Sequence, residues 1–155
     1  MPSVALRTTF IVGFPGETER DVDELCAFVA DHAFDHVGVF TYSHEEGTSA
    51  HQLADDVPAT TKAARRGRVM TLQKRLVGTR LRRRVGQRVR IVIDGSAADH
   101  DLVLRGRLAS QAPDIDAAVF LTDCDPSRYR AGAFTDVEVV AARGYDLIAR
   151  PVHVL

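Results

Sequence analysis

Two strand patterns with one helix pattern between them occupy the first 42 residues, and this arrangement constrains the fold most. Residues 6–13 (LRTTFIVG) are rich in β-branched and aromatic side chains and run into Gly-Phe-Pro-Gly, which stops regular structure. Residues 36–42 (HVGVFTY) form the second pattern. The spacing predicts a right-handed β-α-β unit with parallel strands. Because a parallel pair alone leaves two open edges, we expect these strands to belong to a larger α/β sheet or barrel.

The helix between these strands has a clear start and one apolar stripe. Thr18 is expected to cap it, with Asp21 at the reciprocal capping-box position. The stripe at i, i+3, i+4 and i+7 consists of Val22, Leu25, Cys26 and Val29. Since Cys26 lies on this stripe, we interpret it as a buried core residue and not as a reactive thiol.

The rest of the chain changes character twice. Residues 58–85 predict a long basic amphipathic helix whose apolar face includes Val69, Leu72 and Leu76. Short strand patterns separated by Pro-, Gly- and Asp-rich turns follow at 89–93, 102–108, 117–121, 136–140 and 145–148. The first of them is expected to end at the turn signal Asp94-Gly95. Aromatic residues expected in the barrel core or in turns are Phe120, Tyr129, Phe134 and Tyr145.

Five short strands in so few residues predict a small closed barrel of the oligonucleotide-binding kind, because closure removes the strand edges. The predicted fold class is therefore α/β followed by all-β. We divide the chain into an α/β piece (1–56), a basic linker helix (57–85) and a β-barrel domain (86–155).

Composition excludes several classes of protein. The chain has 155 residues, of which 45% are apolar and 26% charged, as in ordinary globular domains. No apolar run is long enough to span a bilayer and the N-terminal residues do not form a signal-peptide pattern, so we expect a cytoplasmic protein without membrane contact. The two cysteines, Cys26 and Cys124, lie far apart, which excludes a metal site built from cysteine alone.

Charge is divided sharply along the chain. Residues 1–56 carry two basic and eleven acidic side chains, residues 57–93 carry twelve basic and no acidic ones, and residues 94–155 carry six and ten. A basic segment between two acidic ones predicts either an internal electrostatic clamp or a contact with a polyanion. The charge pattern alone favours neither.

Residues 9–17 (TFIVGFPGE) are the most suggestive motif for ligand binding. They lack the Gly-Lys-Ser/Thr of a phosphate-binding loop and the glycine spacing of a dinucleotide site. A glycine turn at the C-terminal end of a parallel strand is nevertheless where small ligands bind in α/β proteins. A tight structural turn is the alternative interpretation. No pairing of histidines and no nucleophile–base arrangement predicts a catalytic residue.

Together, LRTTFIVGFPGETERDV, FDHVGVFTYSHEEGTSA, the basic helix and the barrel resemble the C-terminal part of the radical S-adenosylmethionine methylthiotransferases. The barrel sequence LRGR (104–107) followed by APDIDAAVF (112–120) resembles the RimO-like branch, which modifies the β-carbon of an aspartate in ribosomal protein S-twelve. The alternatives are a tRNA-modifying, MiaB-like enzyme and a stand-alone module that binds RNA or ribosomal protein.

The resemblance implies a division of roles. Residues 4–56 would be the last strands of a radical enzyme's α/β (TIM-like) barrel, and residues 86–151 a TRAM barrel that contacts the substrate. The implied contacts to S-adenosylmethionine are Ile11, Gly13, Val39, Phe40 and Tyr42. The implied contacts to the protein substrate, in the small ribosomal subunit, are Arg105, Arg107, Asp114 and Asp116. The basic helix would contact RNA.

The resemblance also implies two 4Fe-4S clusters, which the family binds with six cysteines. Neither set of three cysteines is present, and Cys26 and Cys124 match no ligand position. We therefore expect no catalytic residue and no metal ligand in this sequence, and we expect it to be an inactive fragment of a longer enzyme. In the family, cluster-bound S-adenosylmethionine supplies a radical and, in a second step, a methyl group.

Overall fold

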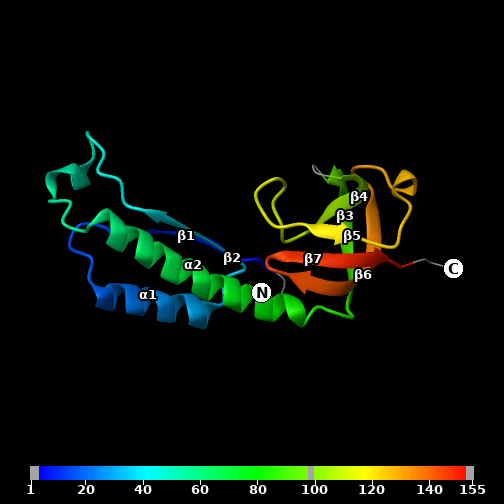
Figure 1. Cartoon of the computed structure of the whole chain (residues 1–155), viewed down its shortest axis with the longest axis horizontal. Coiled ribbons are helices and arrows are strands. Elements are labelled where there is room, and N and C mark those ends of the chain that lie inside the picture. The colour runs from blue at the N-terminus through cyan, green and yellow to red at the C-terminus, as the bar shows by residue number, and fades with distance from the viewer. Residues whose placement is uncertain (1–3, 98–99, 153–155) are drawn as a thin grey trace. The chain divides into compact units, whose positions relative to one another are not determined.

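The computed structural model describes residues 4–97 and 100–152. The predicted α/β piece (1–56) and the predicted barrel domain (86–155) also include residues 1–3, 98–99 and 153–155, which lie outside the described residues. Contacts divide the chain into two compact units, Met1–Leu76 and Val77–Leu155. Helix α2 (Ala59–Arg82) contributes to both units. Figure 1 shows the helices and the two-stranded sheet of the first unit and the strands of the second.

The first unit contains the predicted β-α-β arrangement. Strands β1 (Arg7–Val12) and β2 (His36–Thr41) are parallel and pair from Arg7 opposite His36 to Val12 opposite Thr41. Helix α1 (Glu19–His32) connects them, and a short 3-10 helix, η1 (Ser49–Gln52), lies in the segment that leads to α2. The strand pair predicted from residues 6–13 and 36–42 is confirmed.

Helix α1 begins with the predicted capping box. The Asp21 amide donates to Thr18 Oγ1 at 3.4 Å, and the Thr18 amide donates to Asp21 Oδ2 at 2.7 Å. The Thr18 amide and the Thr18 hydroxyl both donate to the Asp21 carboxylate, and these two hydrogen bonds lower the pKa of Asp21. The helix ends at Ala33, whose φ of 46° places it in the left-handed region that terminates helices.

Both helices cover one face of the sheet. Val12, Val29, Val39 and Val69 form the buried core of the first unit, and Cys26, predicted to be buried, is partly buried and packs against this core. The opposite face carries Ile11 and Phe40, which are neighbours across the two strands and are 59% and 63% exposed. Within the described residues, no element of this unit covers that face with a buried core. The period-2 alternation of strands produces these two faces.

The second unit is a closed five-stranded barrel in the order β3-β4-β5-β7-β6, as predicted. Its strands are β3 (Arg88–Ala97), β4 (His100–Leu108), β5 (Val119–Leu121), β6 (Phe134–Arg143) and β7 (Asp146–Pro151), and a 3-10 helix, η2 (Pro126–Arg128), follows β5. Among the described barrel residues, β5 and β7 pair in parallel and the other paired strands are antiparallel. The barrel core includes Ile91, Ile93, Val119 and Leu147, each at most 1% exposed.

Two details of the barrel prediction are wrong. Asp94-Gly95 does not end a strand, because β3 continues to Ala97 through a bulge between Ile93 and Gly95. Gly95 adopts φ of 132°, so the glycine serves the bulge and not a hairpin turn. Phe134 lies neither in the core nor in a turn: it begins β6 and is 68% exposed. It pairs with Val92, whose side chain is out of phase with the inward-facing Ile91 and Ile93.

Gly106 lies at a tightly packed point of the barrel wall. A Cβ atom there would lie 2.7 Å from the Val92 carbonyl oxygen and 2.9 Å from Ile91 Cδ1. We predict that Gly106→Val lowers the free energy of unfolding of the barrel by roughly 1–3 kcal/mol, because the backbone of β3 must shift. Denaturant unfolding followed by circular dichroism measures the effect. Ala109→Val, at an exposed turn position, is the control and should change stability little.

Candidate functional site

The turn after β1 is held by acidic side chains of the same unit. Gly13 and Gly16 have φ of 76° and 79°, a region that side chains other than glycine's disfavour. The Gly13 amide donates to both carboxylate oxygens of Glu17 at 2.9 Å. The Gly16 amide donates to Asp56 Oδ1, also at 2.9 Å. Two backbone donors at the strand end are therefore satisfied by carboxylates.

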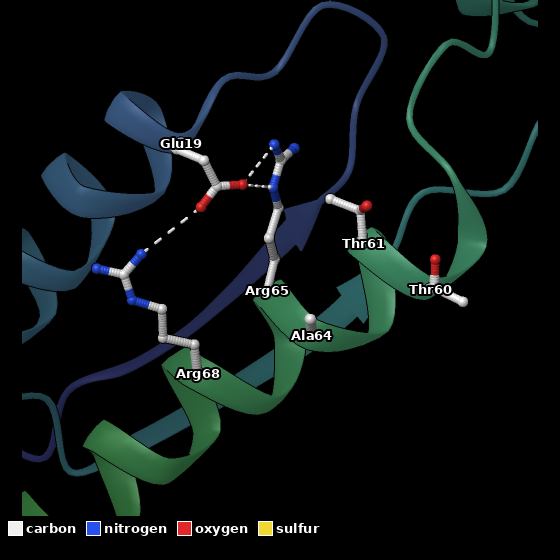
Figure 2. Close-up of a pocket in the computed structure, with 6 residues that line it drawn as sticks. All are labelled: Glu19, Thr60, Thr61, Ala64, Arg65 and Arg68. Atoms are coloured by element: carbon white, nitrogen blue, oxygen red, sulfur yellow. Dashed lines mark hydrogen bonds and ion pairs between the residues drawn. The ribbon is translucent and has the colours of Figure 1, made fainter.

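Arg65 of α2 fixes the Glu17 carboxylate. Its side chain is 8% exposed, and its Nη1 lies 2.8 Å from Glu17 Oε1 and 3.1 Å from the Glu17 carbonyl oxygen. Its Nε donates to Glu19 Oε1 at 2.9 Å (Figure 2). Burial alone would lower the pKa of Arg65, but the hydrogen bonds to Glu19 and Glu17 outweigh burial and raise it.

Beside Arg65 lies an open pocket of about 290 Å³, drawn in Figure 2. It is lined by Glu19, Thr60, Thr61, Ala64, Arg65 and Arg68. Arg68 pairs with Asp23 of α1 and lies 3.8 Å from Glu19. Because both arginines already face carboxylates, the pocket has no excess charge to select an ion. None of the residues predicted to bind a cofactor lines it.

Lys62 contacts the ends of both strands. Its side chain is 9% exposed, and its Nζ donates to Asp55 Oδ1 at 2.6 Å and to the Tyr42 carbonyl oxygen at 3.4 Å. The same Nζ lies 5.0 Å from the centre of the Tyr42 ring. A Cβ atom on Gly13 would be only 2.3 Å from Lys62 Cγ. The glycine is therefore required by packing as well as by its φ.

The residues predicted to contact S-adenosylmethionine lie along one edge of the sheet. Ile11 and Phe40 are exposed neighbours, and Gly13 follows β1 directly. Val39 points into the core, with its carbonyl oxygen accepting from Arg66 Nε at 2.9 Å. The Tyr42 hydroxyl donates to the Ala50 carbonyl oxygen at 3.3 Å. All five positions are thus at the C-terminal half of β1 and β2, where ligands bind in parallel sheets.

Three of the four barrel residues predicted to contact substrate take part in two ion pairs on the outer surface. Arg105 Nη1 lies 3.8 Å from Asp114 Oδ1, and Arg107 pairs with Asp94. Asp114 has φ of 60°, and its side chain is 92% exposed. Asp116 Oδ2 instead accepts from the Ala112 amide at 2.6 Å, so this carboxylate closes its own loop. The structure brings Arg105 and Asp114 together and gives Asp116 a different partner.

Sequence reasoning missed four contributors to these surfaces. Lys62, Arg65 and Arg66 were grouped with a linker helix, although their i, i+3, i+4 spacing already placed them on one face. Ile115, in the loop after β4, is 77% exposed, whereas an apolar side chain is more often expected in the core. The internal-clamp alternative for the basic segment therefore applies to the first half of α2.

The described residues contain neither a group of side chains that could hold a metal ion nor a helix that could span a membrane. No three His, Cys, Asp or Glu side chains there are grouped to hold a metal ion. Cys124 is partly buried. Burial raises the pKa of its thiol, and the negative charges of Asp123 and Asp125 raise this pKa further. Of the described helices, none is long and apolar enough to cross a membrane.

Comparisons with known proteins agree with this architecture. Residues 85–152 match the family model of the TRAM domain. The chain is 40% identical to a ribosomal protein uS12 methylthiotransferase RimO of Solibacter usitatus (strain Ellin6076) over 148 residues, which are 96% of this chain and 32% of that protein. The resemblance predicted from the sequence is confirmed. The chain spans about a third of the length of the curated relatives that it matches.

Two further RimO proteins show the same coverage. That of Opitutus terrae is 43% identical over 151 residues, or 97% of this chain and 30% of the relative. That of Anaeromyxobacter sp. (strain K) is 41% identical over 152 residues, or 98% and 32%. Similarity to RimO proteins therefore extends through both units and is not confined to the TRAM barrel.

We predict that Arg65→Met lowers the free energy of unfolding of the first unit by roughly 2–3 kcal/mol, because Glu17 loses a charged hydrogen-bond partner while it remains largely buried. Chemical denaturation, with an observable specific to residues 1–76, measures the loss. Arg20→Met is the control, since Arg20 and its partner Glu24 are 87% and 66% exposed. Equal losses of unfolding free energy in the two variants would show that the buried Arg65–Glu17 pair contributes no more to stability than the exposed Arg20–Glu24 pair.

Proposed function

We propose that this chain is part of a RimO-type methylthiotransferase, which adds a methylthio group to the β-carbon of an aspartate in ribosomal protein uS12. The observation that carries the proposal is identity of 40–43% with RimO proteins over at least 96% of the chain. The first unit would supply the last strands of a radical enzyme's α/β barrel, and the TRAM barrel would dock on the substrate. The proposal also implies the cytoplasmic location expected from the sequence.

The edge of the β1–β2 sheet would bind S-adenosylmethionine. Ile11 and Phe40 present a continuous apolar surface, which suits the face of an adenine ring. Gly13 lets a ligand approach the backbone beside them, and Val39 to Tyr42 would offer backbone groups. S-adenosylmethionine, when bound, would supply the radical and the transferable methyl group. This chain's own residues would bind and orient it.

The described residues do not fit an iron–sulfur cluster. Such clusters need several cysteine thiolates in one place, whereas Cys26 packs against the core of the first unit and Cys124 against the barrel. In the proposed enzyme, the ligands of both 4Fe-4S clusters would therefore come from outside this sequence.

The barrel and the second half of α2 would contact the ribosomal substrate. The loop after β4 displays Asp114 and Ile115, and Gln111 holds it by donating to the Ala117 carbonyl oxygen at 2.6 Å. An acidic barrel is suited to a basic ribosomal protein. The exposed Arg82 and Arg83 would contact RNA, which keeps the tRNA-modifying alternative and the stand-alone binding module as the competing proposals.

A chimera tests the whole proposal. This chain replaces the corresponding third of the Solibacter usitatus relative, and the chimera is assayed on uS12 by mass spectrometry. We expect the mass increase of one methylthio group on a single aspartate. Gly13→Val in the chimera should reduce the rate more than tenfold, because the new side chain meets Lys62 and strains the turn.

Three outcomes separate the alternatives. Modification of tRNA and not of uS12 would support the MiaB-like alternative. A folded chimera without any methylthiotransferase activity, in which the isolated chain still binds ribosomal RNA, would support the stand-alone module. Normal affinity for S-adenosylmethionine in the Gly13→Val chimera would refute the placement of the cofactor at this turn.

Asp114 gives a matched test of the docking loop. Asp114→Asn removes a charge and keeps a residue that tolerates the left-handed φ. We expect the affinity of the chain for uS12 to fall about three- to tenfold, and more steeply at low salt, as for the loss of one charge at the rim of an interface. Asp123→Asn is the control, because Asp123 is also exposed and has φ of 55°. Equal effects, measured by calorimetry, would exclude a specific role of the loop.

A further inference from the structure

One face of the first two turns of α2 carries three cations directed at the strand ends. Lys62, Arg65 and Arg66 are spaced i, i+3 and i+4, so they share a face. Val69, which follows on the same face, is fully buried in the core. The helix face therefore changes from apolar to cationic where β1 and β2 end.

Two of these cations contact positions of the proposed cofactor edge directly, and the third acts on one of them through Glu17. Lys62 packs against Gly13 and donates to the Tyr42 carbonyl oxygen. Arg66 donates to the Val39 carbonyl oxygen at 2.9 Å. Arg65 binds Glu17, whose carboxylate accepts the Gly13 amide. Three of the five predicted cofactor positions are thus restrained by one helix.

The targets of these contacts distinguish positioning from simple stabilisation. The ion pair between Arg20 and Glu24 joins two exposed side chains and does not hold any backbone atom in place. The α2 cations instead bind backbone carbonyl oxygens and the carboxylate that holds a backbone amide. Because a ligand bound by backbone groups needs those groups in place beforehand, restraint at these atoms acts on affinity.

We infer that Lys62, Arg65 and Arg66 are positioning residues for the nucleotide edge: they preorganise the turn after β1 and the end of β2 without touching S-adenosylmethionine. The inference rests on the proposed function. It assigns the first half of the basic segment to the cofactor site, and leaves a contact with RNA to the second half alone.

Arg66 is the residue that tests the inference, because its side chain lies at an exposed position and its loss should not prevent folding. The variants are Arg66→Ala and Arg66→Lys, which retains a donor for the Val39 carbonyl oxygen. The control is Arg20→Ala. Amide hydrogen exchange of the 155-residue chain reports on residues 39–42, and the chimera with the Solibacter usitatus relative gives KM for S-adenosylmethionine and kcat.

We expect exchange at residues 39–42 to become at least fivefold faster in Arg66→Ala, and wild-type exchange in Arg66→Lys and Arg20→Ala. In the chimera, KM for S-adenosylmethionine should rise about five- to tenfold in Arg66→Ala with kcat within twofold of wild type, and Arg66→Lys should restore most of the affinity. An arginine that only stabilised the unit would, when removed, speed exchange across the first unit and not specifically at residues 39–42, and it would leave KM unchanged. Arg66→Ala that behaves like Arg20→Ala would overturn the inference.

Failure of the proposed function gives a different pattern. A wild-type chimera without activity on any substrate would count against the methylthiotransferase proposal. In that case the exchange measurement on this chain decides whether Arg66 positions the strand end: faster exchange confined to Arg66→Ala supports the restraint, and unchanged exchange refutes it.

Discussion

The first unit depends on pairing the cations of one helix with carboxylates of the segments that follow its two strands. Arg65 is buried with Glu17, and the buried Lys62 reaches the more exposed Asp55, so losing either carboxylate leaves a buried cation without its partner. The same residues close the turn at Gly13 and reach the carbonyl oxygen of Tyr42. Packing of α2, conformation of the turn and placement of the strand ends are therefore one interdependent structure.

The division of charge along the chain has a structural basis in this pairing. An acidic N-terminal segment and a basic helix would repel within themselves, and they neutralise each other when α2 lies against the sheet and α1. The basic residues beyond Leu76 belong to the second unit, where Leu81 packs against the barrel core. The first half of α2 thus forms ion pairs within the first unit, and an apolar residue near its C-terminal end packs against the core of the second unit.

The sequence was sufficient to predict the elements, because their signals are local. Thr18 and Asp21 identify the start of α1, and alternation identifies β1, β2 and the barrel strands. Asp94-Gly95 was misread, since a bulge and a hairpin turn use the same residues and differ only in what pairs beside them. The prediction for Phe134 is wrong because the side of the barrel wall on which its side chain lies depends on its pairing with Val92, which the local sequence does not reveal.

The site was predicted less completely for a related reason. Glycine in a turn can be recognised from spacing, but the partner of a charged side chain depends on long-range packing, as Arg65 and Glu17 show at 48 residues apart. Resemblance to a family supplied candidate cofactor positions, and those positions do lie on one sheet edge. It did not supply the helix that restrains them, because arginines at a surface face and at a buried face have the same sequence pattern.

The close approach of Gly13 to Lys62 restricts how this part of the protein can evolve. Any larger residue at position 13 would overlap the methylene stem of Lys62, and a shorter residue at position 62 would leave Asp55 without its cation. Positions 13, 55 and 62 therefore cannot drift one at a time. A lineage that changes one of them must pass through a less stable protein or change all three together.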